Sequence, residues 1–331
     1  MSETDLEDVV FTKGEPVSYQ RPTSIHHWQL RDLISAADTE HEFYCVHDTK
    51  IYCYDTDTKQ SKLVSNLGFT PNSMTCRGDF VAAGGLHGEL EVRQLACGEV
   101  CFKGAVGTTV NNALHLARIS GGEARLFVCC NDNTIKVYKL PSMESATVIR
   151  CPCPINYAAL SPDGRHLVAV GDCNPTLLYQ ATPTGFVQLA SFTEASDVGM
   201  CCAWNAHGTS FSSCAQDGAV GVWDQRSGAC IARLSCSTAT RCVKFSAAPL
   251  DLLAVSEHEE RVHLFDARRW ASRQTLGLLG GGAAGVPPGA AGISGIAFTQ
   301  GGRLWVGLEA GCVGYDMDSL QRRTFSCADI L

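Results

Sequence analysis

The sequence has no excess of basic residues and no long apolar run. Lysine and arginine total 26 against 34 aspartate and glutamate residues, which gives a formal net charge of −8. Proteins that bind DNA or RNA usually carry a basic surface that neutralises phosphates, so we expect no nucleic-acid partner. No segment approaches the roughly 18 consecutive apolar residues that a membrane helix requires. We therefore expect a soluble protein without membrane association.

An apolar targeting segment is also missing from the first 25 residues, which instead contain Glu3, Asp5, Glu7 and Asp8. We therefore expect a cytoplasmic protein, with the nucleus as an alternative location. Cysteine, by contrast, is abundant, with 18 residues. Most of the cysteines lie in apolar segments such as residues 200–204, where a reduced thiol packs as a small hydrophobic side chain. In a reducing compartment they would fill the core rather than form a disulfide framework.

No catalytic, cofactor-binding or metal-binding motif is complete. The glycines of residues 280–285 follow a Gly-x-Gly-x-x-Gly pattern, but Pro287 stands where a nucleotide-binding helix would begin. Cys151 and Cys153 lack a second pair of ligands at zinc-like spacing. Residues 292–295 lack the Gly-x-Ser-x-Gly spacing of a nucleophile elbow. The sequence thus predicts no cofactor, no metal and no enzymatic activity.

A repeat with a period of about 40 to 50 residues runs through the chain, and periods of this length indicate repeat architectures. Each repeat contains a short alternating segment that ends in a large side chain, an aromatic in six repeats and an arginine in one. These positions are Tyr54, Arg93, Tyr138, Tyr179, Trp223, Phe265 and Tyr315.

Turn signals divide each repeat further. Residues 160–170 and 204–214 each join two apolar runs through a polar or glycine turn, which is a hairpin signal. A second turn follows, as at residues 216–218. Four strands per repeat, arranged radially, predict an all-β protein that is a single seven-bladed β-propeller. The expected blades are residues 26–65, 71–104, 110–150, 155–193, 198–235, 239–278 and 292–326.

The two ends of the ring are less defined by pattern. Residues 28–34 fit either the innermost strand of the first blade or a short amphipathic helix, and we favour the strand. The strand that closes the ring has two candidates, residues 8–12 and residues 321–325, and the sequence leaves this choice open.

Three segments are expected outside the regular blades. Residues 1–25 form an acidic arm that we expect to be flexible. The propeller itself spans residues 26–326 and contains a flexible loop rich in Gly, Ala and Pro at residues 278–292. Residues 327–331 form a short C-terminal tail.

One repeat carries a family likeness. Residues 222–226 contain a Trp-Asp dipeptide, and Asp217 stands at the turn where such repeats usually keep an aspartate. This repeat resembles the WD-repeat family, although the Gly-His dipeptide that typically opens a WD repeat is missing throughout. The resemblance implies a propeller that displays binding surfaces to other proteins. Residues 252–268 and 293–325 also resemble an uncharacterised C-terminal domain found in fungal and plant WD-repeat proteins.

Two Asp-x-Arg boxes follow the third strands of consecutive repeats, Asp224 with Arg226 and Asp266 with Arg268. Equivalent placement predicts two arginines on one rim, one blade apart. Residues 211–226 resemble the box of WD-repeat substrate receptors for cullin-4 ubiquitin ligases, and residues 253–268 match it in part. A guanidinium oriented by an aspartate suits protein recognition. Alternatively, each Asp and Arg cap the strand turn and form a surface ion pair of little energetic value.

These observations favour a non-catalytic scaffold that binds other proteins. The specific alternative is a ubiquitin-ligase substrate receptor, in which Asp224, Arg226, Asp266 and Arg268 contact an adaptor. A third hypothesis, an enzyme or small-molecule binder that uses the central channel, requires convergent titratable groups that no motif in the sequence indicates.

Overall fold

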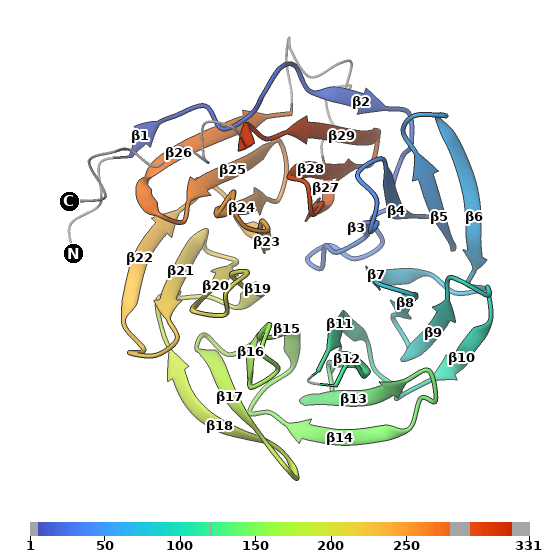
Figure 1. Cartoon of the computed structure of the whole chain (residues 1–331). Coiled ribbons are helices and arrows are strands. Elements are labelled where there is room, and N and C mark those ends of the chain that lie inside the picture. Colours follow the sequence, from blue (N-terminus) through green and yellow to red (C-terminus); the bar gives the residue numbers. More distant parts are fainter. Residues whose placement is uncertain (1–5, 120, 279–291, 320–331) are drawn as a thin grey trace.

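The computed structural model describes residues 6–119, 121–278 and 292–319, and its sheets are arranged radially around a central axis (Figure 1). We call the space along this axis the central channel. These described residues form seven sheets, one for each blade. The expectation of a seven-bladed all-β propeller is confirmed. Among the described residues, no helix is long and apolar enough to cross a membrane.

Each blade orders its strands from the channel outward. Blades one to four contain β3 (Ile34–Ala36), β4 (Glu42–His47), β5 (Lys50–Asp55) and β6 (Gln60–Asn66); β7 (Pro71–Arg77), β8 (Phe80–Gly85), β9 (Glu89–Gln94) and β10 (Val100–Ala105); β11 (Asn111–Arg118), β12 (Ala124–Cys130), β13 (Thr134–Leu140) and β14 (Ser145–Arg150); and β15 (Ile155–Leu160), β16 (His166–Gly171), β17 (Thr176–Thr182) and β18 (Gly185–Phe192).

The remaining blades follow the same order, with one strand supplied from the N-terminal region. Blades five to seven contain β19 (Gly199–Trp204), β20 (Ser210–Ala215), β21 (Ala219–Asp224) and β22 (Cys230–Ser235); β23 (Thr240–Phe245), β24 (Leu252–Glu257), β25 (Arg261–Asp266) and β26 (Arg269–Gly277); and β27 (Ile293–Phe298), β28 (Arg303–Leu308), β29 (Gly311–Asp316) and β2 (Val17–Tyr19).

The repeat positions identified by pattern all lie in third strands. The aromatic side chains at these positions are buried or half-buried, and Trp223 packs against Phe211 with ring centroids 5.5 Å apart. Inner strands such as β15 and β19 are buried along their whole length, whereas the outer strand β18 is mostly exposed or half-buried. The continuous apolar runs therefore mark the strands packed between neighbouring blades.

Asparagines join the inner strands of successive blades. In six blades the pairing of the first two strands shifts register at the second residue of the inner strand, which is typical of a β-bulge. In three of these blades an asparagine side chain donates from that position to the first carbonyl of the next inner strand. These bonds are Asn72 to Asn111 at 3.1 Å, Asn112 to Ile155 at 2.9 Å and Asn156 to Gly199 at 3.0 Å.

The N-terminal region closes the ring. β2 pairs antiparallel with β29 and supplies the outer strand of blade seven. Before it, Thr12 forms a bridge with Met317, and β1 (Glu7–Asp8) pairs in parallel with β26 of blade six. The chain thus runs along the outside of blades six and seven before it enters blade one (Figure 1).

The sequence left the choice of closing strand open between residues 8–12 and residues 321–325. Residues 8–12 lie against blades six and seven but do not form the closing strand, and residues 321–325 lie outside the described residues. Within the arm of residues 1–25, the part from residue 6 onward packs on the propeller, because its backbone completes sheet edges that would otherwise lack hydrogen-bond partners. The flexible loop and the tail predicted at residues 278–292 and 327–331 fall almost wholly outside the described residues.

The start of blade one also differs from the expected strand at residues 28–34. β3 begins only at Ile34, and the chain before it bends into the centre of the ring (Figure 1). This path allows the Asp32 carboxylate to accept hydrogen bonds from Tyr157 and Lys244 across the channel, which a regular inner strand would not allow.

The cysteines divide into two groups. Those such as Cys129, Cys202 and Cys242 are buried free thiols that fill the core, as expected. Cys153 and Cys173 instead form a disulfide, with their Cα atoms 5.9 Å apart. The expectation covered most of the cysteines, and this pair is an exception to it, because the loops before β15 and after β16 bring the two side chains together.

Candidate functional site

A polar cluster spans the central channel. Asp32 Oδ2 accepts hydrogen bonds from the Tyr157 hydroxyl at 2.9 Å and from Lys244 Nζ at 3.1 Å. Lys244 Nζ also donates to the Tyr157 oxygen at 2.8 Å. The carbonyl oxygen of Asp32 accepts the N–H of Met74 at 2.9 Å. Because Met74, Tyr157 and Lys244 lie on β7, β15 and β23, the cluster connects four blades across the channel.

The charges of this cluster compensate one another. Burial and the neighbouring Asp32 carboxylate raise the pKa of Tyr157 well above its usual value, so the phenol keeps its proton. Burial opposes the positive charge of Lys244, but Asp32 and Tyr157 outweigh it and hold the lysine pKa well above its usual value. Neither Tyr157 nor Lys244 is therefore suited to exchange a proton near neutral pH.

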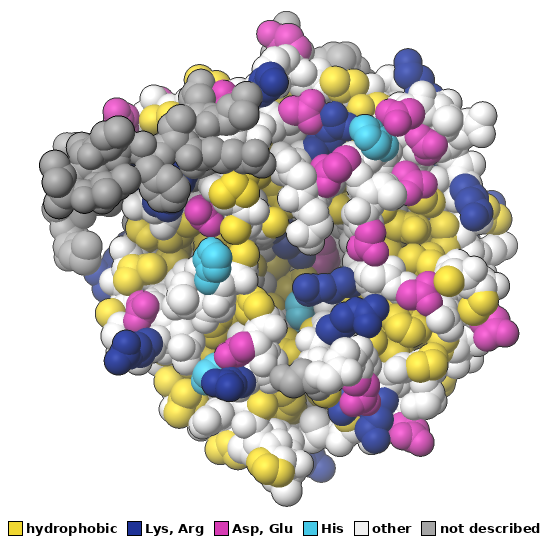
Figure 2. Space-filling model, in the orientation of Figure 1, with side chains coloured by type: hydrophobic (Ala, Val, Ile, Leu, Met, Phe, Trp, Pro, Cys, Tyr) yellow, Lys and Arg dark blue, Asp and Glu magenta, His cyan; other side chains and the backbone are white. Residues whose placement is uncertain are grey.

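A cavity of about 490 Å³ opens above the cluster, at the end of the channel where the first strand of each blade turns into the second. The face shown in Figure 2 is hollowed at its centre, with basic side chains nearby. The lining includes Arg77 and Arg118 at the exposed rim, Trp204 and Phe298 on the walls, and His115.

His115 lines the cavity as a neutral imidazole. Its Nε2 accepts the N–H of Leu160 at 3.2 Å, which places the proton on Nδ1. Burial, together with the charges of Arg77 and Lys244, lowers the pKa of His115 to about 3. The cavity therefore offers fixed donors and apolar walls, an arrangement suited to binding.

The first Asp-x-Arg box forms the turn between β21 and β22. Asp224 Oδ1 accepts the N–H of Ser227 at 2.7 Å and its hydroxyl at 2.6 Å. These bonds hold the pKa of the Asp224 carboxyl below its usual value. Arg226 is exposed. The turn contacts the first-to-second-strand turn of its own blade, since Gln225 N–H donates to the Thr209 carbonyl at 2.9 Å.

The second box occupies the equivalent turn between β25 and β26. Asp266 Oδ1 accepts the N–H of Arg268 at 2.9 Å. Arg268 Nε lies 3.6 Å from Asp266 Oδ1 and 4.0 Å from Asp251 Oδ2. Both boxes therefore lie on adjacent blades and on the face that carries the cavity, as their placement in the repeats predicts. Turn capping by the aspartate is present in both boxes, and a role of the arginines in binding stays a prediction.

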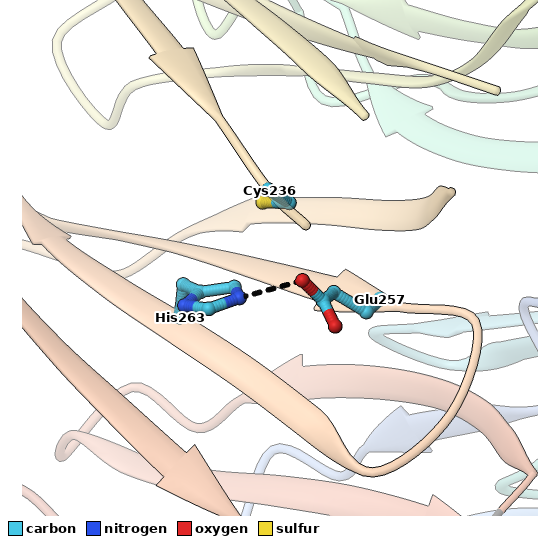
Figure 3. Close-up of side chains that lie close together, drawn as sticks. All are labelled: Cys236, Glu257 and His263. Atoms are coloured by element: carbon cyan, nitrogen blue, oxygen red, sulfur yellow. Dashed lines mark hydrogen bonds and ion pairs between the residues drawn. The ribbon is translucent and has the colours of Figure 1, made fainter. Parts of the chain in front are cut away.

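Cys236, Glu257 and His263 could hold a metal ion, because one ligand atom of each lies within 4.8 Å of the others. Figure 3 shows His263 directed at the carboxylate. His263 Nε2 lies 3.1 Å from Glu257 Oε1, which also accepts the N–H and the hydroxyl of Ser237, each at 3.0 Å. The positive charges of Arg261 and Arg273 act on His263 and oppose a further cation.

Blade five contains the same arrangement without the histidine. Asp217 Oδ2 accepts the N–H of Ser196 at 2.7 Å and its hydroxyl at 2.8 Å. Glu257 is the last residue of β24, whereas Asp217 follows β20, and each carboxylate anchors a serine in the segment that leads into its blade. A serine thus takes the place of the missing Gly-His dipeptide, and the Glu257 cluster fits this structural role better than metal binding.

The pattern reading missed the channel cluster. It placed residues 239–278 in one blade without singling out Arg241 and Lys244, the two charged residues of its inner strand. A charge on a strand buried between blades must find a partner, and this was the available signal. Asp32 gave no signal, because its partners are more than a hundred residues away.

Comparisons with known proteins agree with the geometry. The WD domain, G-beta repeat model matches residues 186–224. This match runs from β18 to the end of β21, so the sequence repeat and the blade are offset by one strand. An uncharacterised protein domain, DUF2415, matches residues 238–276, which correspond to blade six. This match includes residues 252–268, whereas residues 293–325 lie outside it.

Similar chains occur in two yeasts. An uncharacterised protein of Schizosaccharomyces pombe is 28% identical over 271 residues, which cover 75% of this chain and 76% of that protein. An uncharacterised protein of Saccharomyces cerevisiae is 25% identical over 214 residues, which cover 52% of this chain and 29% of that protein.

The fold also matches a solved structure. A chain in the crystal structure of the mitotic checkpoint complex superposes with a TM-score of 0.74 over 93% of both chains, at 11% sequence identity, which shows a common fold alone. The described chain is thus a seven-bladed β-propeller in which one segment matches the WD repeat and another matches the uncharacterised DUF2415 domain.

Proposed function

We propose that this chain is a protein-interaction platform and that the face with the cavity is its docking surface. The observation that carries the proposal is the cavity of about 490 Å³, which shares one face with the two Asp-x-Arg turns. A closed ring of sheets holds these features rigidly, and rigid display lowers the entropic cost of binding.

The chemistry of the cavity supports binding more than catalysis. Lys244 and Tyr157 are hydrogen-bonded to each other and to Asp32, with pKa values raised well above their usual range. The pKa of His115 is lowered to about 3, which makes the imidazole a weak base. A general acid or base works best with a pKa near the operating pH, and these three groups are far from it.

The specific form of this proposal is a substrate receptor of a cullin-4 type ubiquitin ligase. Arg226 is exposed and lies in a turn that Asp224 fixes through its hydrogen bonds to Ser227. Its guanidinium N–H groups are therefore held on a rigid turn and are accessible to a partner. Arg268 is held near Asp251 and Asp266 and would contribute less. In this form, Arg226 makes the main contact with the ligase adaptor.

Affinity purification with mass spectrometry tests both the general interaction platform and the specific ligase receptor. The tagged wild type is compared with an Arg226→Ala, Arg268→Ala double variant. The matched control is Lys139→Ala, Arg165→Ala, which removes one basic side chain near the end of β13 and one from the turn between β15 and β16, both on the same face. Recovery of cullin-4 and its adaptor with the wild type and the control, but not with the double variant, supports the receptor. Their absence from every sample contradicts the receptor and leaves the general platform.

The docking face is tested separately by charge reversal. Arg77→Glu with Arg118→Glu changes the rim of the cavity, whereas Lys50→Glu with Arg261→Glu changes the first residues of β5 and β25, at the other end of the channel. We expect partners found with the wild type to be lost at least about tenfold with the first variant and retained with the second. The opposite result would place the docking surface on the other face.

A further inference from the structure

Two buried arginines lie at the end of the channel opposite the cavity. Arg31 precedes β3 and is 8% exposed, and Arg241 is the second residue of β23 and is 4% exposed. Arg31 Nη1 donates to the His27 carbonyl, and Arg241 Nη1 donates to Gln216 Oε1. The Nε–H of each is buried without a partner. In the described part of the chain, neither guanidinium lies within 4.0 Å of a carboxylate.

The surroundings add positive charge and no close counter-charge. Burial and the nearby Arg241 lower the pKa of Arg31 to about 10. Burial and both arginines also lower the pKa of His27 and of His258. Asp32 follows Arg31 directly, but its carboxylate is already bound to Tyr157 and Lys244.

The acidic residues nearest to this end lie outside the arginine pair. Glu259, Glu309 and Asp197 are exposed and act on the arginines only at longer range. Glu259 Oε1 also lies 3.3 Å from His258 Nε2. A buried charge without a close partner costs folding free energy, so two in one place call for a ligand that compensates them.

We propose that Arg31 and Arg241 form a binding site for an oxyanion, either a carboxylate or a phosphate group. Guanidinium groups present planar sets of N–H donors that match the two oxygens of such a group. Trp28 is 66% exposed and stacks on His27 with ring centroids 6.4 Å apart, so an apolar surface borders the site. This combination suits an acidic group carried on a peptide as well as a free ion.

The site is tested by titration at constant ionic strength, with Trp28 fluorescence and the thermal unfolding midpoint as readouts. Two probes separate the sources of the oxyanion, inorganic phosphate and a capped Gly-Glu-Gly tripeptide. The variants are Arg241→Gln and Arg241→Lys, and Arg165→Gln, at an exposed position in the turn between β15 and β16, is the control. A Trp28→Phe variant identifies the source of the fluorescence change.

We expect at least one probe to raise the midpoint of the wild type and of Arg165→Gln. Arg241→Gln should weaken binding by about tenfold or more, since one charge-assisted pair is lost. Arg241→Lys should fall between them, because it keeps the charge but loses the planar donors. Tighter binding of the tripeptide assigns the oxyanion to a peptide, and tighter binding of phosphate assigns it to a free ion. Equal responses of wild type and both Arg241 variants, or no response at all, overturn the site.

Discussion

The two ends of the central channel hold charged side chains in opposite states. At the cavity end, Lys244 is paired with Asp32 and hydrogen-bonded to Tyr157. At the other end, Arg31 and Arg241 are buried without a close carboxylate among the described residues. Lys244 and Arg241 lie on the same inner strand, β23, and Asp32 and Arg31 are neighbours in the segment before β3. The two ends of the channel therefore differ in how the charges are paired, not in which elements carry them.

This difference assigns a structural role to the charges at one end of the channel and a binding role to the charges at the other end. A cluster whose charges are compensated stabilises the fold, and here it links four blades through Asp32. An uncompensated cluster is destabilising by itself and gains from an external partner. Substitutions at the two ends should therefore change stability by very different amounts.

The largest effect is expected from Asp32→Ala. This change leaves the half-buried Lys244 ammonium, whose side chain is 23% exposed, without its counter-charge and removes the acceptor of Tyr157. Breaking a buried ion pair from one side costs about 3–5 kcal/mol of unfolding free energy, and the partial exposure of Lys244 places the expected loss at the lower end of that range. Urea unfolding of the wild type and the variant measures this loss.

Two controls sharpen that measurement. Asp38→Ala removes an exposed carboxylate that also lines the cavity, and its effect should stay within about 0.5 kcal/mol. The double variant Asp32→Ala, Lys244→Met should lose less stability than Asp32→Ala, because it removes the unpaired charge. If Asp32→Ala and Asp38→Ala unfold at the same urea concentration, the cluster does not hold the ring.

A smaller loss is expected from Tyr157→Phe, which removes one hydroxyl and leaves the Asp32–Lys244 pair intact. Hydrogen bonds to charged groups contribute about 1.5–3 kcal/mol, which sets the expected decrease in unfolding free energy. Tyr315→Phe is the matched control, since the Tyr315 hydroxyl is buried and has no hydrogen-bond partner among the described residues. A larger effect of the control would contradict the assigned network.

Acid should weaken the cavity end through His115. The folded protein lowers the pKa of His115 to about 3, from an ordinary value of 6.5. Between pH 6.5 and about pH 3, His115 therefore binds a proton in the unfolded chain but not in the folded protein. Stability is therefore complete above pH 6.5 and falls as the pH decreases from there toward about 3. We expect His115→Gln to reduce this loss by about 1 kcal/mol for each pH unit below 6.5.

Urea unfolding at several pH values measures that slope. The lowered pKa values of His27, His258 and His263 add to the wild-type slope in the same direction and remain in the variant. His207→Gln, at an exposed position, should leave the slope unchanged. An unchanged slope in His115→Gln would show that this imidazole titrates normally.

The fold was predictable where its signals repeat along the chain. Residues such as Tyr54, Tyr138 and Trp223 mark the third strands, because each faces the same packing between blades. Arg93 occupies the equivalent position of its third strand, β9, and its charge is compensated because its Nη2 lies 3.4 Å from Glu91 Oε1. The closing strand β2 was not predictable from pattern. It is three residues long, and its partner β29 lies near the other end of the chain.

The candidate site was predictable only in part. The equivalent positions of Asp224 and Asp266 in the repeat placed both turns on one face, and the structure agrees. The partners of Asp32 depend on distances across the ring, which a linear pattern does not contain. Arg241 and Lys244 could have been singled out as charges within a buried strand, but their opposite roles follow only from which of them has a partner.

The smallest effect is expected from Arg241→Met, and it tests the comparison most directly. In buffer without phosphate or carboxylate, the change removes an uncompensated buried charge and one hydrogen bond to Gln216. These terms oppose each other, so stability should change by less than about 0.5 kcal/mol or increase. Lys244→Met, which leaves the Asp32 carboxylate without its ion-pair partner, should lose several-fold more in the same urea measurement. Equal losses would mean that Arg241 is compensated within the fold, and the two ends of the channel would then be alike.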